Sequence, residues 1–213
     1  MRRLLGVYGG TFDPIHLGHI SAASDVAQSL QLDEVRMLLS ARPPHRQQPE
    51  LSADNRFRLL QSALQEYSQL IADDSELRRQ GPSYMVDTLS ALRKQRATQD
   101  SSLLLILGAE AFSSFMSWHR WDEIIKLAHI VITTRAGFSD QLGSELQEYI
   151  SAFITTDKSQ LKEQTHGKIY QLPVAAINIS ATDIRKRLKT SEPVQQLLPA
   201  KTWALIRENR FYT

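Results

Sequence analysis

The 213-residue chain contains no cysteine. This absence excludes a disulfide framework, a cysteine-ligated metal site and a thiol nucleophile, and it is compatible with a reducing compartment. Long apolar runs are also missing, because the longest interior one, Leu103–Leu107, is far too short to span a bilayer. The early run Leu4–Tyr8 is interrupted by Gly6 and does not resemble a signal peptide. We therefore expect a cytoplasmic protein without a membrane partner.

A strong net charge is absent as well. The 25 Lys and Arg residues nearly balance the 23 Asp and Glu residues, which leaves a formal charge of +2. The last 34 residues carry seven basic and three acidic side chains, whereas residues 1–107 carry twelve of each. We expect no nucleic-acid partner from this distribution, but the C-terminal stretch could attract a small polyanion.

Short apolar runs alternate with amphipathic helical patterns along the chain. Runs that predict buried strands cover residues 4–8, 35–39, 103–107, 130–133 and 168–172. Helical spacing covers residues 17–30, 57–67, 86–92, 121–128, 182–188 and 201–207. Strands without polar alternation, separated by helices, predict a doubly wound α/β fold with a parallel sheet and helices on both faces. We expect one domain over residues 1–213, with a small helical extension from about residue 180.

The loop after the first predicted strand contains glycines, histidines and an aspartate within eleven residues. Ligands of such sheets bind at the carboxyl ends of the strands. Gly9 and Gly10 let the backbone approach a ligand closely, and His16 and His19 would share one face of a helical first turn. A helix N-terminus there would favour an anion. A zinc site that combines the two histidines with Asp13 is the alternative.

A second informative segment lies near the C-terminus, at residues 178–188. Ser180 and Asp183 have the spacing of a capping box, so a helix should begin there. One interpretation is a well-capped, solvated basic helix. The other is a phosphate cradle, in which hydroxyl groups, free N–H groups and Arg185 converge on the helix N-terminus.

These two segments resemble the paired motifs of the (T/H)xGH nucleotidyltransferase superfamily. The first, Gly10-Thr11-Phe12-Asp13-Pro14-x-His16-x-Gly18-His19, resembles its nucleotide-binding motif, and Ile179-Ser180-x-Thr182-x-x-Arg185 resembles its ISxTxxR element. The resemblance implies a Rossmann-like fold that binds the α-phosphate and ribose at the first motif and the triphosphate at the second. Class I aminoacyl-tRNA synthetases share a related element, but they are much longer and need a Lys-rich loop that this sequence lacks.

Three further stretches resemble the bacterial nicotinate-nucleotide adenylyltransferases of NAD biosynthesis. They are Pro43–Arg46, Gly81–Leu89 and Ser117–Trp121, accompanied by Leu107-Gly108 and Arg135–Phe138. The resemblance covers essentially the whole chain. It implies an enzyme that joins ATP, with Mg²⁺, to nicotinate mononucleotide and releases deamido-NAD and pyrophosphate, with no dedicated protein cage for the metal.

The same resemblance assigns residues to roles. His16 and His19 would be catalytic, on the α-phosphate side. ATP would contact Gly9, Gly10, Thr11, Phe12, Gly18, Gly108, Glu110, Arg135, Ile179, Ser180, Thr182 and Arg185. Nicotinate mononucleotide would contact Ser40, His45, Arg46, Tyr84, Met85, Trp118 and His119. Trp118 would stack on the pyridine ring and backbone N–H groups would bind its carboxylate, whereas Trp121, Trp203 and Phe211 are expected to be packing residues.

The sequence departs from the family pattern at three positions. Met85 stands where the family usually has Thr, Ser40 where it often has Asn, and Glu110 where it usually has Asp. These changes affect individual contacts more than the reaction.

Four other functions stay open at this point. The nearest are sister adenylyltransferases that use nicotinamide mononucleotide or phosphopantetheine. More distant are a non-catalytic nucleotide sensor or RNA-binding module, and a zinc hydrolase. The oligomeric state is open.

Overall fold

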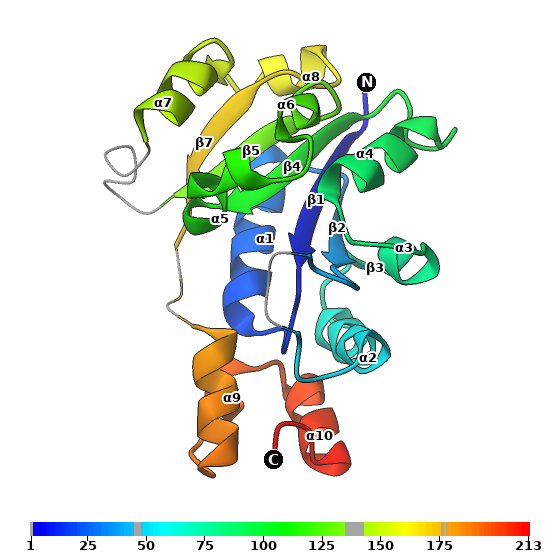
Figure 1. Ribbon diagram of the computed structural model, residues 1–213, viewed down its shortest axis with the longest axis vertical. Coiled ribbons are helices and arrows are strands. Elements are labelled where there is room, and N and C mark those ends of the chain that lie inside the picture. Colours follow the sequence, from blue (N-terminus) through cyan, green and yellow to red (C-terminus); the bar gives the residue numbers. More distant parts are fainter. Residues whose placement is uncertain (1, 45–47, 135–142, 176, 178) are drawn as a thin grey trace.

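The computed structural model describes residues 2–44, 48–134, 143–175, 177 and 179–213. Within them lies one seven-stranded sheet of order β3-β2-β1-β4-β5-β7-β6, in which every neighbouring pair is parallel (Figure 1). The strands are β1 (Leu4–Gly10), β2 (Glu34–Leu39), β3 (Leu70–Asp73), β4 (Ser102–Gly108), β5 (His129–Thr134), β6 (Ile154–Thr155) and β7 (Ile169–Pro173). The predicted Rossmann-like α/β fold is confirmed.

Helices cover both faces of this sheet (Figure 1). The helices that pack on one face are α1 (Leu17–Leu30), α2 (Ala53–Leu64) and α8 (Gln160–Glu163), and α9 (Ala181–Lys189) and α10 (Ala200–Asn209) extend the same core beyond the strand ends. Those on the other face are α4 (Met85–Lys94), α5 (Ala109–Ser113), α6 (Trp121–Ile124) and α7 (Ser144–Ser151). The short helix α3 (Ser75–Arg78) follows β3. No helix of the described residues is long and apolar enough to cross a membrane.

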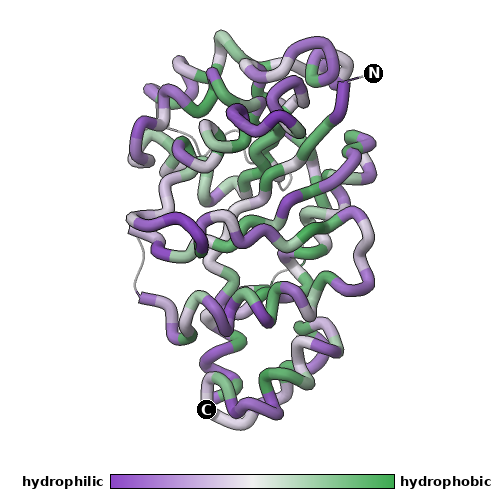
Figure 2. Tube along the Cα trace, turned by 90° about the vertical axis from the view of Figure 1, so that its right-hand side faces the viewer, coloured by the Kyte–Doolittle hydropathy of each residue, from purple (hydrophilic) through white to green (hydrophobic). Residues whose placement is uncertain are grey.

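The strands are apolar on both sides because each side faces a separate core. In β4, Leu104 and Ile106 belong to the core under α1 and α2, whereas Leu103, Leu105 and Leu107 belong to the core under α4 and α5. All five are at most 4% exposed. In the hydropathy tube, green segments gather in the interior and purple segments lie mainly on the outside (Figure 2).

The predicted boundaries hold best in the centre of the sheet. Helix α1 spans the residues predicted for it. The prediction that the next helix continues to Tyr67 is wrong, because α2 ends at Leu64 and the Tyr67 N–H bonds to the Leu64 carbonyl in a turn. The strands β3 and β6 were not predicted, because both are short edge strands that expose an isoleucine, Ile71 and Ile154.

The strand order reverses between β1 and β4. From β1 the chain runs outward to β2 and β3, and it then returns to place β4 on the other side of β1. This is the switch point at which an open parallel sheet leaves a crevice beyond its strand ends. Helices α9 and α10 lie beyond the carboxyl ends of β1 and β2, so the C-terminal extension borders that crevice (Figure 1).

Candidate active site

The first loop holds its two histidines face to face. His16 is the N-cap of α1, and His19 follows in the first turn. Their rings stack with centroids 3.7 Å apart, and the His16 backbone N–H donates to His19 Nδ1 at 3.4 Å. Phe12 packs edge-on against the His19 ring, with centroids 5.2 Å apart. The structure therefore brings the predicted pair together at a helix N-terminus, where free N–H groups favour an anion.

His16 has an unsatisfied ring nitrogen. The residue is 5% exposed, and its buried Nδ1 atom has no hydrogen-bond partner among the described residues. Burial lowers the pKa of His16 to about 4, so the imidazole is neutral at pH 7. A buried polar atom without a partner costs free energy unless a ligand satisfies it. His16 is therefore a neutral, buried imidazole at the N-terminus of α1.

Close packing within the loop explains Gly10. A Cβ atom at Gly10 would lie 2.5 Å from the Phe12 ring, so no larger residue fits. Phe12 itself is 2% exposed and has a positive φ of 47°, which turns the chain towards Asp13 and α1. The Phe12 side chain is therefore part of the core, and only its backbone can face a ligand.

A cleft of about 240 Å³ opens beside this loop, at the carboxyl ends of β1, β2 and β4. Eight of the predicted site residues line it: Gly9, Gly10, Thr11, Ser40, Tyr84, Met85, Trp118 and His119. Met85 lies directly over the first loop, because a Cβ atom at Gly9 would come within 2.7 Å of its terminal methyl group. The cleft thus joins the first loop to the segments assigned to the mononucleotide.

Aromatic side chains form one wall of the cleft. The rings of Tyr84 and His119 stack with centroids 4.2 Å apart, and Trp118 lies partly buried against Phe115. Trp121, three residues further on, packs instead against Tyr149 with centroids 4.7 Å apart. The distinction between a tryptophan at the cleft and a tryptophan in the packing is therefore visible in the structure.

The C-terminal motif begins its helix as expected but is capped differently. Ser180 is the N-cap of α9, yet its side chain makes no capping hydrogen bond. The predicted capping box is wrong, because Asp183 forms an ion pair with Arg187 at 2.8 Å, one turn further along the helix. The Ser180 side chain is exposed and Arg185 Nη2 donates to the Thr182 hydroxyl at 3.4 Å.

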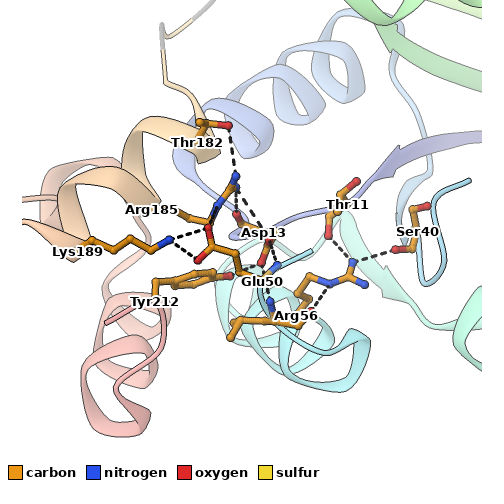
Figure 3. Close-up of polar contacts among 10 residues, drawn as sticks. Thr11, Asp13, Ser40, Glu50, Arg56, Thr182, Arg185, Lys189 and Tyr212 are labelled. Carbon is orange, nitrogen blue, oxygen red and sulfur yellow. Dashed lines mark hydrogen bonds and ion pairs between the residues drawn. The ribbon is translucent and has the colours of Figure 1, made fainter. Parts of the chain in front are cut away.

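Asp13 connects the two motifs (Figure 3). Its carboxylate accepts hydrogen bonds from the Glu50 N–H at 2.9 Å, the Leu51 N–H at 3.4 Å and the Tyr212 hydroxyl at 2.8 Å. Arg185 Nη1 donates to the Asp13 carbonyl at 2.7 Å. Because its carboxylate oxygens are already engaged, Asp13 is not placed to complete a zinc site with the two histidines.

Glu50 stands in front of the basic side chains of α9. Its carboxylate accepts from Arg185 Nε at 3.0 Å and forms an ion pair with Lys189 Nζ at 2.9 Å (Figure 3). The hydrogen bond from Lys189, together with Arg185, holds the pKa of the Glu50 carboxyl below its usual value, against the effect of burial. An incoming polyanion would therefore compete with Glu50 for these two cations.

Arg56 is a site residue that sequence reasoning missed. It lies on α2 and is 1% exposed, and its guanidinium donates to one backbone carbonyl of the first loop and to three carbonyls of the connection between β2 and α2. The available signal was its helical phase, since Arg56 shares a face with the buried Leu59, Leu60 and Ala63. An arginine in an amphipathic helix normally points to solvent, as Arg58 does.

The remaining assigned residues are less closely tied to the cleft. Gly108 ends β4, and Glu110 is exposed in the first turn of α5, beside the cleft residue Ala111. Gly18 lies against His16, and Ile179 packs on the core next to Ser180. His45, Arg46 and Arg135 lie outside the described residues. Trp203 and Phe211 pack against the core, as predicted.

The described residues contain no group of three or more His, Cys, Asp or Glu side chains that could hold a metal ion.

Comparisons with known proteins agree with this geometry. The cytidylyltransferase-like family model matches residues 7–187. A protein of Methylococcus capsulatus named probable nicotinate-nucleotide adenylyltransferase is 41% identical over 210 residues, which cover 98% of this chain and 99% of the relative. A protein of Pseudomonas syringae pv. tomato with the same name is 38% identical over 99% of this chain and 94% of its own.

A solved structure supports the fold. The nicotinic acid mononucleotide adenylyltransferase of Plasmodium falciparum, complexed with NaAD, superposes with a TM-score of 0.73 at 16% identity, over 99% of this chain and 98% of its own.

Proposed function

The chain belongs to the cytidylyltransferase-like family and, within it, to the nicotinate-nucleotide adenylyltransferases, and from this premise we propose the reaction at the site described above. The enzyme transfers the adenylyl group of ATP to the 5′-phosphate of nicotinate mononucleotide. The products are deamido-NAD and pyrophosphate, so the protein acts in NAD biosynthesis.

One observation carries this proposal. The loop that bears His16 and His19 borders an aromatic cleft on one side and, through Asp13, Arg185 of α9 on the other. A site for a phosphate chain and a site for a flat ring therefore meet at one helix N-terminus, beyond the switch point of the sheet.

The reaction needs no strong general base, because the attacking phosphate is already ionised at neutral pH. Its oxygen attacks the α-phosphorus of ATP, the bond from that phosphorus to the oxygen bridging to the β-phosphate breaks, and pyrophosphate leaves. Catalysis then consists of aligning these atoms and stabilising the charge that develops on the phosphoryl oxygens.

His16 and His19 act on the α-phosphate. A neutral imidazole always carries one N–H donor, and this donor of His16 would serve a phosphoryl oxygen. An anion bound there would also raise the pKa of His16 from about 4, which strengthens the interaction.

The β- and γ-phosphates bind at the start of α9. Ser180 and Thr182 supply hydroxyl groups, and the Arg185 guanidinium supplies charge-assisted hydrogen bonds. Glu50 releases Arg185 and Lys189 when the triphosphate arrives.

Nicotinate mononucleotide binds in the cleft. Trp118 stacks on the pyridine ring, and backbone N–H groups near Tyr84, Met85 and His119 bind the carboxylate. Met85 has no hydroxyl, so only the backbone serves at that position.

ATP enters together with Mg²⁺. The phosphate oxygens of ATP would hold the ion, because Mg²⁺ commonly binds substrate phosphates with few protein ligands. The ion supplies charge neutralisation on the phosphate oxygens. A cytoplasmic location and a single nucleotidyltransferase unit over residues 1–213 stay predictions.

The test is pyrophosphate release from MgATP with each acceptor in turn. Nicotinate mononucleotide should support turnover, whereas nicotinamide mononucleotide should support far less, because a neutral amide accepts the same N–H donors more weakly than a carboxylate. Phosphopantetheine, which has no pyridine ring, should also support far less. Equal rates with acid and amide would overturn the substrate assignment. If no acceptor supported pyrophosphate release, a non-catalytic nucleotide sensor would be the better explanation.

A further inference from the structure

The Arg56 guanidinium joins three separate segments of the chain (Figure 3). Nη1 donates to the Thr11 carbonyl at 2.6 Å and to the Ser40 carbonyl at 2.9 Å. Nη2 donates to the Ala41 carbonyl at 3.1 Å, and Nε donates to the Leu51 carbonyl at 3.2 Å. One buried side chain thus holds the loop after β1, the loop after β2 and the start of α2.

Two of these segments serve different substrates. Thr11 belongs to the loop assigned to ATP, whereas Ser40 belongs to the loop assigned to nicotinate mononucleotide, and both residues line the cleft. The Ser40 N–H also donates to the Gly10 carbonyl at 2.8 Å. Nη1 of Arg56 is therefore a second, side-chain link between two loops that must keep the reacting phosphates in register.

We infer that Arg56 is a positioning residue for adenylyl transfer, which sets the distance between the ATP loop and the mononucleotide loop without touching either substrate. This inference rests on the proposed function. A reaction that proceeds by alignment alone is sensitive to that distance, since a misplacement of about 1 Å can cost roughly 100-fold in rate. The guanidinium suits the task because its donors are fixed in one plane, whereas a lysine ammonium is a single point.

Arg93 provides a matched control at the opposite end of the sheet. Its Nε donates to the Leu127 carbonyl at 2.8 Å, its Nη1 to the carbonyls of Gln99 at 3.2 Å and Ser101 at 2.7 Å, and its Nη2 to the Thr165 carbonyl at 2.6 Å. The pattern of donors is the same as in Arg56. These carbonyls precede β4, β5 and β7, away from the cleft.

The experiment compares Arg56→Lys with Arg93→Lys. Both substitutions should lower the melting temperature, because both leave carbonyls without partners. Arg56→Lys should also lower kcat about 10- to 100-fold, with each KM within about threefold, whereas Arg93→Lys should leave kcat unchanged well below its melting temperature.

Binding measured by calorimetry gives a readout that stability alone does not move. The affinity of Arg56→Lys for ATP alone and for nicotinate mononucleotide alone should change little. The affinity for deamido-NAD, which spans both loops, should fall about tenfold, as expected when two subsites lose their fixed spacing. Equal kcat values and equal product affinities in the two variants would overturn the inference.

Other outcomes are separable. If the wild type released no pyrophosphate, the proposed function would fail, and unchanged product affinity in the variant would count against Arg56 by itself. If Arg56→Lys did not fold, hydrogen exchange of the Arg56 Nε–H in the wild type would decide. Exchange at least 100-fold slower than in free arginine supports the link, and exchange at the free rate contradicts it.

Discussion

A buried histidine lies at each end of the parallel strands, but the hydrogen bonds of the two histidines differ. At the amino edge, His129 begins β5, is fully buried and has both ring nitrogens satisfied, by the Gln164 carbonyl and the Lys168 N–H, each at 3.1 Å. At the carboxyl edge, His16 is almost as buried, but its Nδ1 has no partner among the described residues. Burial lowers the pKa of each to about 4.

The two histidines share some properties and differ in others. Burial and a shifted pKa are common to both histidines, so neither property identifies function. The two histidines differ in their hydrogen bonds: both ring nitrogens of His129 have partners, whereas the Nδ1 atom of His16 has none among the described residues.

The largest effect is expected when each of the two histidines is replaced by glutamine. His16→Gln should lower kcat about 100- to 1000-fold, the usual cost of losing a donor to a developing phosphoryl charge. His129→Gln should leave kcat unchanged and lower the melting temperature instead. Steady-state kinetics and thermal unfolding on both variants decide the matter, and a kcat loss in His129→Gln would contradict the division between the two edges.

The pH dependence of stability should show the two histidines acting alike without substrate. Each has a folded-state pKa lowered from 6.5 to about 4, so the unfolded chain takes up protons first. Their contribution is present above pH 6.5 and is lost as the pH falls to 4, at roughly 3 kcal/mol for each.

Denaturant unfolding across this range measures the loss. The His129→Gln variant should be less stable at pH 8 but should lose less stability on acidification. Saturating MgATP should change only the part that belongs to His16, and a pH dependence identical in wild type and variant would exclude the assignment to His129.

Arg185 and Arg187 compare the side of α9 that we propose binds phosphate with the side that pairs only with Asp183. Arg185→Ala should raise the KM for ATP about 10- to 100-fold and spare nicotinate mononucleotide, because it removes charge-assisted hydrogen bonds to the phosphates. Arg187→Ala, which removes only the ion pair with Asp183, should change either KM less than about twofold. Similar KM values for ATP in both variants would contradict the proposed phosphate site at α9.

The tryptophans give the smallest expected effect. Trp118→Ala should raise the KM for nicotinate mononucleotide about tenfold through loss of ring stacking. Trp121→Ala should keep both KM values and lower the melting temperature, since Trp121 packs on Tyr149 and Phe115. A larger KM change in Trp121→Ala would show that the wrong tryptophan lines the site.

Much of the fold around the cleft could be predicted because it depends on local sequence. The bounds of α1 follow from the periodic apolar residues after Gly9 and Gly10. The first motif lies at the carboxyl end of β1, and the second lies at the start of α9. Short edge strands were missed because partial exposure weakens their apolar pattern. The Ser180 capping box failed because Asp183 pairs with Arg187, a choice that local spacing does not settle.

The links between distant segments were beyond the sequence for a different reason. Asp13 and Tyr212 are 199 residues apart, and Arg56 reaches back 45 residues to Thr11. Nothing in the local pattern marks Arg56 as different from Arg58 except its phase on the helix. Glu50 likewise became a partner of Arg185 only when α9 folded back beyond the ends of β1 and β2.

The sequence by itself determined the parallel α/β sheet and the positions of the two motifs, because these depend on periodicity and spacing along the chain. Only the tertiary structure decided which buried polar groups are satisfied. His16 and His129 are the same residue in similar burial, and what separates them is which backbone atoms the fold brings within hydrogen-bond distance.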